Sequence, residues 1–189
     1  MERDIEQLLE RVSERQRTTF YGKYRGLVSD NADPDGLGRI RAEVPAVLGE
    51  AISQWAMPCV PFAGPGHGLA LIPEVGDGVW IEFEAGNPNS PIWSGCWWAG
   101  GQRPDPAGEV QRLLATSPGH QFLIDEDADE IKLVHPGGGK LVIGSDAITL
   151  SIGQTKIELT SSEVVINDGM AKITTAGASL VNDAFKVGG

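Results

Sequence analysis

Apolar side chains near the start of the sequence recur at the spacing of an α-helix. They stand at i, i+3, i+4 and i+7, at Ile5, Leu8, Leu9 and Val12. This spacing is typical of an amphipathic helix, which we expect within residues 1–20. The apolar stripe either packs on the chain's own domain or docks on a partner or on copies of itself, and the spacing alone favours neither.

Beyond this helix, short runs of β-type residues alternate with turn residues such as Gly, Pro and Asp. In the run 79–84, Val79, Ile81 and Phe83 occupy every second position, as in a strand with one buried face. The expected strands are Tyr21–Val28, Arg39–Val44, Gln54–Val60, Leu69–Ile72, Val79–Glu84 and Ile92–Trp98. Many short strands without helices between them predict a small antiparallel barrel over residues 21–100.

The pattern changes again after a stretch rich in Pro and Gly, and we expect a linker over residues 101–116. Over residues 117–189, short strands recur at close intervals, separated by Gly, Ser, Asp and Asn. The expected strands are Glu130–Val134, Lys140–Ile143, Ile148–Ile152, Lys156–Leu159, Val164–Ile166, Ala171–Thr174, Ser179–Val181 and Phe185–Val187. A weak repeat of this kind predicts stacked or wound β structure.

Within these strands every second residue is apolar. We expect these residues to form a narrow core: Ile131, Leu133, Ile148, Leu150, Ile152, Ile157, Leu159, Val164 and Ile166. The residues between them, such as Lys132, Thr149 and Glu158, are expected to face outward. A lone meander of this kind leaves one face and its edges uncovered, which invites pairing with another chain. The sequence therefore predicts self-association, although the pattern does not set the number of copies.

The charge of the chain narrows the choice of partner. Fifteen Lys and Arg against 26 Asp and Glu give a net charge of −11. Binding to a nucleic-acid backbone depends on Lys and Arg that release counterions, so we expect no nucleic-acid partner. No apolar stretch reaches the roughly 20 residues that span a bilayer, and the charged start MERDIEQLLE is unlike a signal peptide. We therefore expect the chain to fold and assemble in the cytoplasm.

Motifs that would indicate catalysis are missing from the sequence. It has no G-x-S-x-G elbow, P-loop, H-E-x-x-H or C-x-x-C, so we expect no enzymatic activity, no catalytic residue and no cofactor. His67, His120 and His135 stand in separate contexts rich in Gly and Pro, which predicts turn or loop residues and no metal site within one chain. Cys59 and Cys96 are expected to be two buried, reduced thiols.

Two further clusters allow a binding interpretation beside a structural one. Trp93, Trp97 and Trp98 would suit a stacking platform for single-stranded nucleic acid, but the acidic charge favours packing in the core and at its rim. The acidic run Asp125–Glu130 lacks the fixed offsets and the glycine of an EF-hand. We interpret it as a solvated turn between two strands.

Four phrases follow one another in order along the first two thirds of the chain. They are DPDGLGRIRAEVP at 33–45, PFAGPGHG at 61–68 with IPEVGDGV at 72–79, FEAGNPNSPIWSG at 83–95, and SPGH at 117–120 with IDE at 124–126 and IKL at 131–133. In this order they resemble the family of phage baseplate assembly protein V. The same signature occurs in spike proteins of contractile injection systems and in VgrG-type spikes.

The resemblance implies an all-β protein with a short N-terminal helix. It implies an OB-fold antiparallel barrel used as a trimer collar, followed by a trimeric intertwined β-helix that serves as a needle. It also implies a baseplate hub above the spike, with Ile5, Leu8, Leu9 and Val12 facing this partner. The needle would make transient contact with the target membrane and puncture the envelope.

Two departures from the family pattern change these expectations. The sequence has no inserted lysozyme domain after the barrel, so digestion of the cell wall is not expected. It also lacks a C-terminal H-x-H motif, so we expect a blunt end, capped by a separate PAAR-type tip protein, in place of an iron-bearing apex.

Three hypotheses of different classes follow from these observations. The first is a non-enzymatic, trimeric central spike of a phage tail or injection particle. The alternative is an OB-fold binding module for single-stranded nucleic acid or glycan, suggested by the tryptophan-rich strand. The third is a hydrolase that uses a pair of the many carboxylates, which spacing alone does not decide.

Overall fold

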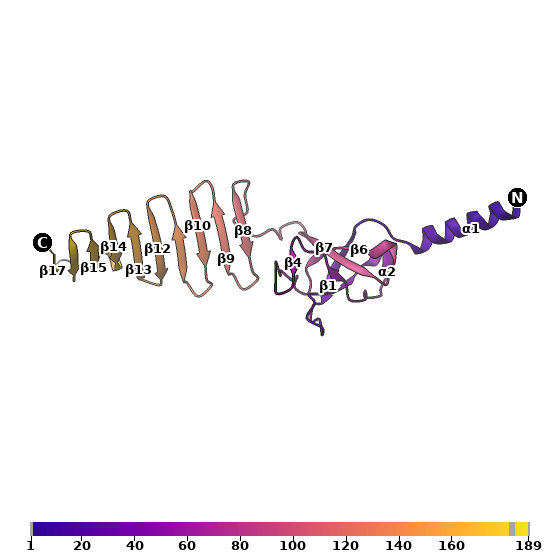
Figure 1. Cartoon of the computed structure of the whole chain (residues 1–189), viewed down its shortest axis with the longest axis horizontal. Helices are drawn as coiled ribbons and strands as arrows, with labels where there is room; N and C mark the ends of the chain where they lie inside the picture. The colour runs from indigo at the N-terminus through magenta and orange to yellow at the C-terminus, as the bar shows by residue number, and fades with distance from the viewer. Residues whose placement is uncertain (1, 182–183, 189) are drawn as a thin grey trace. The chain divides into compact units, whose positions relative to one another are not determined.

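The computed structural model describes residues 2–181 and 184–188. The chain divides into two compact units, Met1–Gln102 and Arg103–Gly189 (Figure 1). Most of the regular structure is β-strand, preceded by one long helix. The predicted all-β class with an N-terminal helix is therefore confirmed.

The N-terminal helix α1 spans Glu2–Thr18. Its apolar stripe is exposed, with exposed fractions that range from 47% for Val12 to 62% for Leu9. After the last turn, the backbone N–H of Thr19 donates to the carbonyl of Arg15 at 3.1 Å. Of the two interpretations of this stripe, packing on the chain's own domain is not what the structure shows.

Five strands of the first unit form one sheet in the order β2-β1-β6-β7-β3. They are β1 Tyr24–Asp30, β2 Arg41–Glu43, β3 Met57–Pro58, β6 Gly78–Phe83 and β7 Pro91–Trp97, with the short helices α2 Pro45–Leu48 and η1 Glu84–Gly86 between them. All pairs are antiparallel except β3 with β7. This sheet is an OB-like half-barrel around a compact core made by Val28, Ile40, Ala42, Val44, Ala56, Val79, Ile81, Phe83 and Trp93.

The turn before β2 is organised by one carboxylate. Asp33 accepts hydrogen bonds from the backbone N–H of Leu37 at 2.8 Å and of Arg39 at 3.1 Å, and from Nε of Arg39 at 3.0 Å. The guanidinium of Arg39 holds the pKa of Asp33 far below its usual range. Gly38, with a φ of +75°, turns the chain so that its carbonyl accepts from Nε1 of Trp93 at 3.0 Å. The segment DPDGLGR therefore forms a turn that is held by hydrogen bonds to Asp33 and is linked to the core through Trp93.

Two parts of the first unit differ from the sequence-based expectation. Leu69–Ile72 is not a strand; instead β4 Ala63–Gly64 and β5 His67–Gly68 form a two-stranded hairpin in the Gly/Pro loop before it. The backbone N–H of Leu69 still donates to the carbonyl of Phe62 at 3.0 Å beside this hairpin, but Leu69 and Ile72 are exposed and no strand among the described residues pairs with the run 69–72. The prediction of buried thiols is also wrong, since Cys59 and Cys96 are both exposed.

The second unit is a single antiparallel sheet whose ten strands follow chain order. They are β8 Gln111–Ala115, β9 Gln121–Asp125, β10 Glu130–Val134, β11 Lys140–Ile143, β12 Ala147–Ile152, β13 Thr155–Thr160, β14 Glu163–Ile166, β15 Ala171–Thr174, β16 Gly177–Leu180 and β17 Phe185–Val187, with η2 Asn167–Gly169 after β14. Strand length falls from six residues in β12 and β13 to three in β17, a taper visible in Figure 1. The first strand, β8, lies inside the stretch expected as a linker, so the connection is shorter than expected.

The single chain forms an open meander in which each strand pairs only with its neighbours in sequence. The intertwined β-helix requires three chains and stays a prediction. No helix among the residues that the structure describes is long and apolar enough to cross a membrane.

Candidate functional site: the apolar face of the ten-stranded sheet

Cross-strand registers sort the side chains of the sheet into ladders. One ladder joins Ile124, Ile131, Ile143, Ile148, Leu159, Val164 and Ile173. A second, two residues away on each strand, joins Leu114, Phe122, Leu133, Leu141, Leu150, Ile157 and Ile166. Because residues two apart on a strand point to the same side, both ladders lie on one face, which we call the apolar face.

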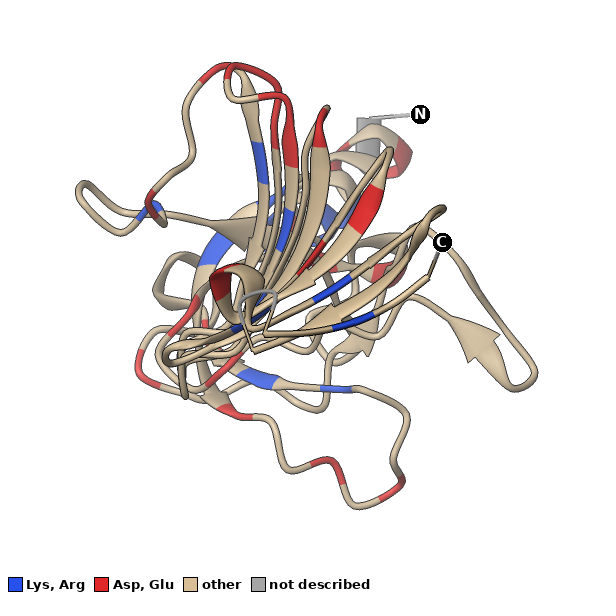
Figure 2. Cartoon of the chain, turned by 90° about the vertical axis from the view of Figure 1, so that its left-hand side faces the viewer, with Lys and Arg blue, Asp and Glu red and all other residues tan. Residues whose placement is uncertain are grey.

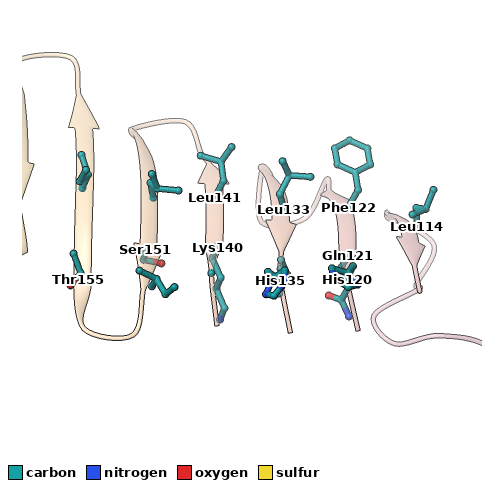
Figure 3. Close-up of a pocket in the computed structure, with 15 residues that line it drawn as sticks. Leu114, His120, Gln121, Phe122, Leu133, His135, Lys140, Leu141, Ser151 and Thr155 are labelled. Carbon is teal, nitrogen blue, oxygen red and sulfur yellow. The ribbon is translucent and has the colours of Figure 1, made fainter. Parts of the chain in front are cut away.

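The apolar face is uncovered in the single chain. The exposed fraction is 39% for Ile131, 54% for Leu150 and 59% for Phe185 near the end of the sheet. Side by side on this face, Phe122, Leu133 and Leu141 line a hollow of about 740 Å³ (Figure 3). A continuous exposed apolar surface of this kind marks an interaction site.

The opposite face is mostly polar from β10 onward. Its central ladder begins with Leu113 and Leu123 and continues through Lys132, Val142, Thr149, Glu158, Val165, Lys172, Ser179 and Lys186. Lys156 pairs with Glu158 at 3.0 Å and with Asp168 at 3.1 Å, and these carboxylates raise its pKa. Basic and acidic residues are interspersed on the strands in Figure 2. Charges that are already paired within the chain suit a face that stays in water.

The structure places all nine residues predicted for the needle core on the apolar face. Eight of them belong to the two ladders, and Ile152 follows Leu150 by two positions on β12. Their burial among three chains remains a prediction. Sequence reasoning missed several residues of the same face, namely Leu114, Phe122, Leu141, Ile143 and Ile173. The alternation of Leu141 and Ile143 carried the necessary signal, but the apolar Val142 between them obscured it.

Two of the three histidines, which stand far apart in the sequence, lie together. The rings of His120 and His135 are in edge-to-face contact, with centroids 4.9 Å apart. His67 lies in the first unit, where its ring contacts Phe62. Among the described residues there is no group of three or more His, Cys, Asp or Glu side chains placed to hold a metal ion.

Trp93 and Trp97 of β7 and Trp98, which follows it, lie in different surroundings. Trp93 is buried in the barrel core, and Nε1 of Trp97 donates to the carbonyl of Val79 at 3.1 Å. Arg25 lies over the Trp97 ring at 5.1 Å. Only Trp98 presents most of its surface, at 64% exposed. This arrangement agrees with the packing interpretation of these side chains.

The acidic run forms the turn between β9 and β10. The carboxylate of Asp125 accepts from Nε2 of Gln111 at 3.1 Å and from the backbone N–H of Ala128 at 3.3 Å. The bond from Gln111, followed by the backbone bonds of the turn, lowers the pKa of Asp125. Asp129 takes a φ of +54°, which closes the turn. These contacts are those of a solvated hairpin connection.

Comparison with known protein families agrees with this division of the chain. Residues 24–98 match the type VI secretion system/phage-baseplate injector OB domain. Residues 111–172 match the phage baseplate V C-terminal trimerisation domain, which supports a homotrimer. None of the curated proteins compared with the chain matches it. Two domains of one family in sequence order, over most of the length, show that this chain belongs to the phage baseplate V family.

Proposed function

We propose that three copies of this chain form the central spike of a contractile tail or injection baseplate, joined through their apolar sheet faces. The observation that carries the proposal is the contrast between the two faces of one sheet. One face is a continuous row of large, half-exposed Ile, Leu and Phe side chains, and the other carries paired charges. A surface that is apolar on one side only needs a partner on that side.

The family match supplies the number of chains, and the geometry of the sheet is the reason that each chain needs partners. The sheet is a single layer, so it has no second layer of its own to cover the apolar face. Covering a half-exposed Leu or Ile contributes on the order of 1 kcal/mol, and each chain offers many of them. Three sheets wound about one axis bury all three faces equally and leave the charged faces in water.

Several finer roles are part of the same proposal. The exposed stripe of α1, made by Ile5, Leu8, Leu9 and Val12, docks on the baseplate hub. The narrowing end at β17 receives a PAAR-type tip protein and leads the spike into the target envelope. The spike acts mechanically, without catalysis, cofactor or nucleic acid, and is assembled in the bacterial cytoplasm before it joins the particle. Shared hydrogen bonds along the wound strands would carry the load.

Sedimentation or light scattering of the purified full chain at micromolar concentration tests the trimer. We expect a species of about 60 kDa, three times the 20.1 kDa chain. Leu150→Asp should abolish it, since three carboxylates would meet in an apolar core.

The matched control is Ser179→Asp. Ser179 lies on the opposite face between Lys172 and Lys186, so the same added charge meets basic neighbours and leaves the trimer intact. A wild-type monomer would refute the proposal, and a trimeric Leu150→Asp variant would refute the assignment of the apolar face as the interface.

A further inference from the structure

The outer face of the half-barrel carries a tryptophan that two arginines share. Ile40 is fully buried, so its neighbour Arg41 on β2 points away from the core. The antiparallel bridge from Ile40 to Ala56 sets this next residue of β2 opposite Trp55. The guanidinium carbon of Arg41 lies 4.7 Å from the centre of the Trp55 ring, and that of Arg39 lies 5.7 Å from it. These cation–π contacts hold two positive charges at one indole.

The two arginines differ in their ionic partners. Nε of Arg39 donates to the carboxylate of Asp33 at 3.0 Å, and the same guanidinium pairs with Asp35. Among the described residues, no carboxylate forms an ion pair with Arg41, and its Nε is buried without a hydrogen-bond partner. A guanidinium has five N–H donors and does not lose its charge in a protein. Arg41 is therefore a cation that the described part of the chain does not neutralise.

Charged and polar neighbours of Arg41 do not supply the missing partner. Asp30 is its register partner on β1, but Oδ1 of that carboxylate accepts from the backbone N–H of Ala32 at 2.9 Å. Glu43 stands two residues along β2 and is exposed. Ser29, the extra residue of the bulge in β1 beside Arg41, has a buried Oγ that also lacks a partner. Two buried polar atoms without partners, on neighbouring strands, favour a bound ligand at this place.

Exposed apolar side chains flank the Arg41–Trp55 pair. Met57 follows Trp55 by two positions and is 47% exposed. Leu27, the register partner of Glu43, is 45% exposed. Tryptophan and arginine contribute most strongly to protein interfaces, where surrounding contacts keep water away from them. The surface therefore fits a protein partner, and its free positive charge calls for an acidic group on that partner.

We propose that Arg41 and Trp55 form a docking site for an acidic side chain, Asp or Glu, of a protein other than this chain. The planar guanidinium offers two parallel N–H donors to one carboxylate, the bond that Arg39 obtains from Asp33 within the chain. The net charge of −11 repels carboxylates elsewhere, so a free guanidinium makes this place selective for them. The site is separate from the proposed trimer contact, because it lies in the first unit.

NMR of the full chain with labelled arginine and tryptophan tests the site without any substitution in the protein studied. The probe is glutamate blocked as its N-acetyl methylamide, and the matched probe is the same derivative of glutamine at equal ionic strength. We expect the Nε–H signal of Arg41 and the Nε1–H signal of Trp55 to shift with the glutamate probe and to saturate. Half-saturation is expected on the order of 10 mM, the range of a single charge-assisted contact. Unchanged signals, or equal shifts with both probes, overturn the inference.

Variants identify the residue that binds the probe. Arg41→Gln should abolish the shift of Trp55, and Trp55→Phe assigns that signal by its loss. The matched control is Arg25→Gln, which removes the same charge from another arginine that lies over a tryptophan, Trp97, at 5.1 Å, and should leave the response unchanged. A Trp55 shift that persists in Arg41→Gln overturns the inference. A stronger response to inorganic phosphate than to the glutamate probe overturns the assignment of the ligand as a carboxylate.

Sedimentation of Arg41→Gln distinguishes a foreign partner from a second copy of this chain. We expect this variant to associate as the wild type does, because the site lies outside the proposed trimer contact. A loss of association in Arg41→Gln, with association intact in Arg25→Gln, would mean that another copy supplies the carboxylate and would overturn the choice of partner.

Discussion

Both units of this chain are built from β-strands, but only the first buries most of the apolar side chains of its strands within the chain. In the first unit, Ile40, Val44, Val79 and Ile81 are fully buried within the chain. In the second, Leu123 is the one large apolar side chain among the described residues that is buried to a similar degree, and the apolar face is open. Strands can therefore form without a buried core. A single copy of the second unit has the strands and leaves its apolar face open.

The difference in burial between the two units has two causes, the connectivity of the strands and the size of the side chains. The half-barrel pairs strands distant in sequence, β1 with β6 and β3 with β7, so its sheet curves around a centre. Aromatic rings fill that centre: Tyr24 lies 5.7 Å from Phe83, and Phe20 packs on both. The meander pairs only sequence neighbours and stays a single layer. Closure needs long-range pairing, and the described strands of one second unit make none.

The largest difference is expected when the two units are studied as separate fragments. We expect the fragment Met1–Gln102 to unfold as a monomer, with a melting temperature independent of concentration. The fragment Arg103–Gly189 should instead melt at a temperature that rises with concentration, because its folding is coupled to association. Calorimetry over a hundredfold range of concentration measures this. A compact, cooperative monomer of Arg103–Gly189 would contradict both the comparison and the proposed interface.

Equal truncations in the two units should have unequal consequences. Ile81→Ala empties a fully buried site and should cost about 2–5 kcal/mol in the free energy of unfolding, without changing the trimer. Leu150→Ala removes a side chain that is 54% exposed in the single chain, so its cost should occur mainly in association. Denaturant titrations at two protein concentrations separate the effects. An association defect in Ile81→Ala would show that the barrel core also holds the trimer together.

Alternation of residue type was enough to predict eight of the ten strands of the second unit, β10 to β17, whereas β8 and β9 were not predicted. Glu130–Val134 and Lys140–Ile143 have the expected bounds, because small β-branched side chains at every second position leave few alternatives to a half-buried strand. The nine core candidates share one face for the same reason. The strand β8 was missed because prolines and glycines precede it, and only its partner β9 makes it part of the sheet.

Other features depend on contacts that local pattern does not contain. The meeting of His120 and His135 depends on the register between β9 and β10, which is set by the turn between them and not by either histidine's neighbours. Whether Leu69 and Ile72 are buried depends on the elements beside them, and among the described residues no strand pairs with this run. The number of chains in the assembly came from family resemblance, since an open apolar face does not specify how many copies close it.

Acid should lower the stability of the first unit through the carboxylate of Asp33. Arg39 lowers the pKa of Asp33, so the ionised carboxylate stabilises the folded barrel at pH values above about 3.9, the ordinary value for Asp. That contribution is lost as pH falls below this value. Asp33→Asn should therefore lower the melting temperature of the first unit at pH 7 and have less effect near pH 2. Equal effects at both pH values would show that the turn is held by shape and not by charge.

The smallest effect is expected on the charged face of the sheet. Lys156 pairs with Glu158 and Asp168 in water, where such pairs contribute little and are screened by salt. Lys156→Met should leave the trimer intact and lower the melting temperature slightly at low salt, with the difference from wild type disappearing at high salt. Thermal melts at two ionic strengths measure this. Dissociation of the trimer in Lys156→Met would mean that the charged face takes part in the interface, and the contrast between the two faces would no longer explain the assembly.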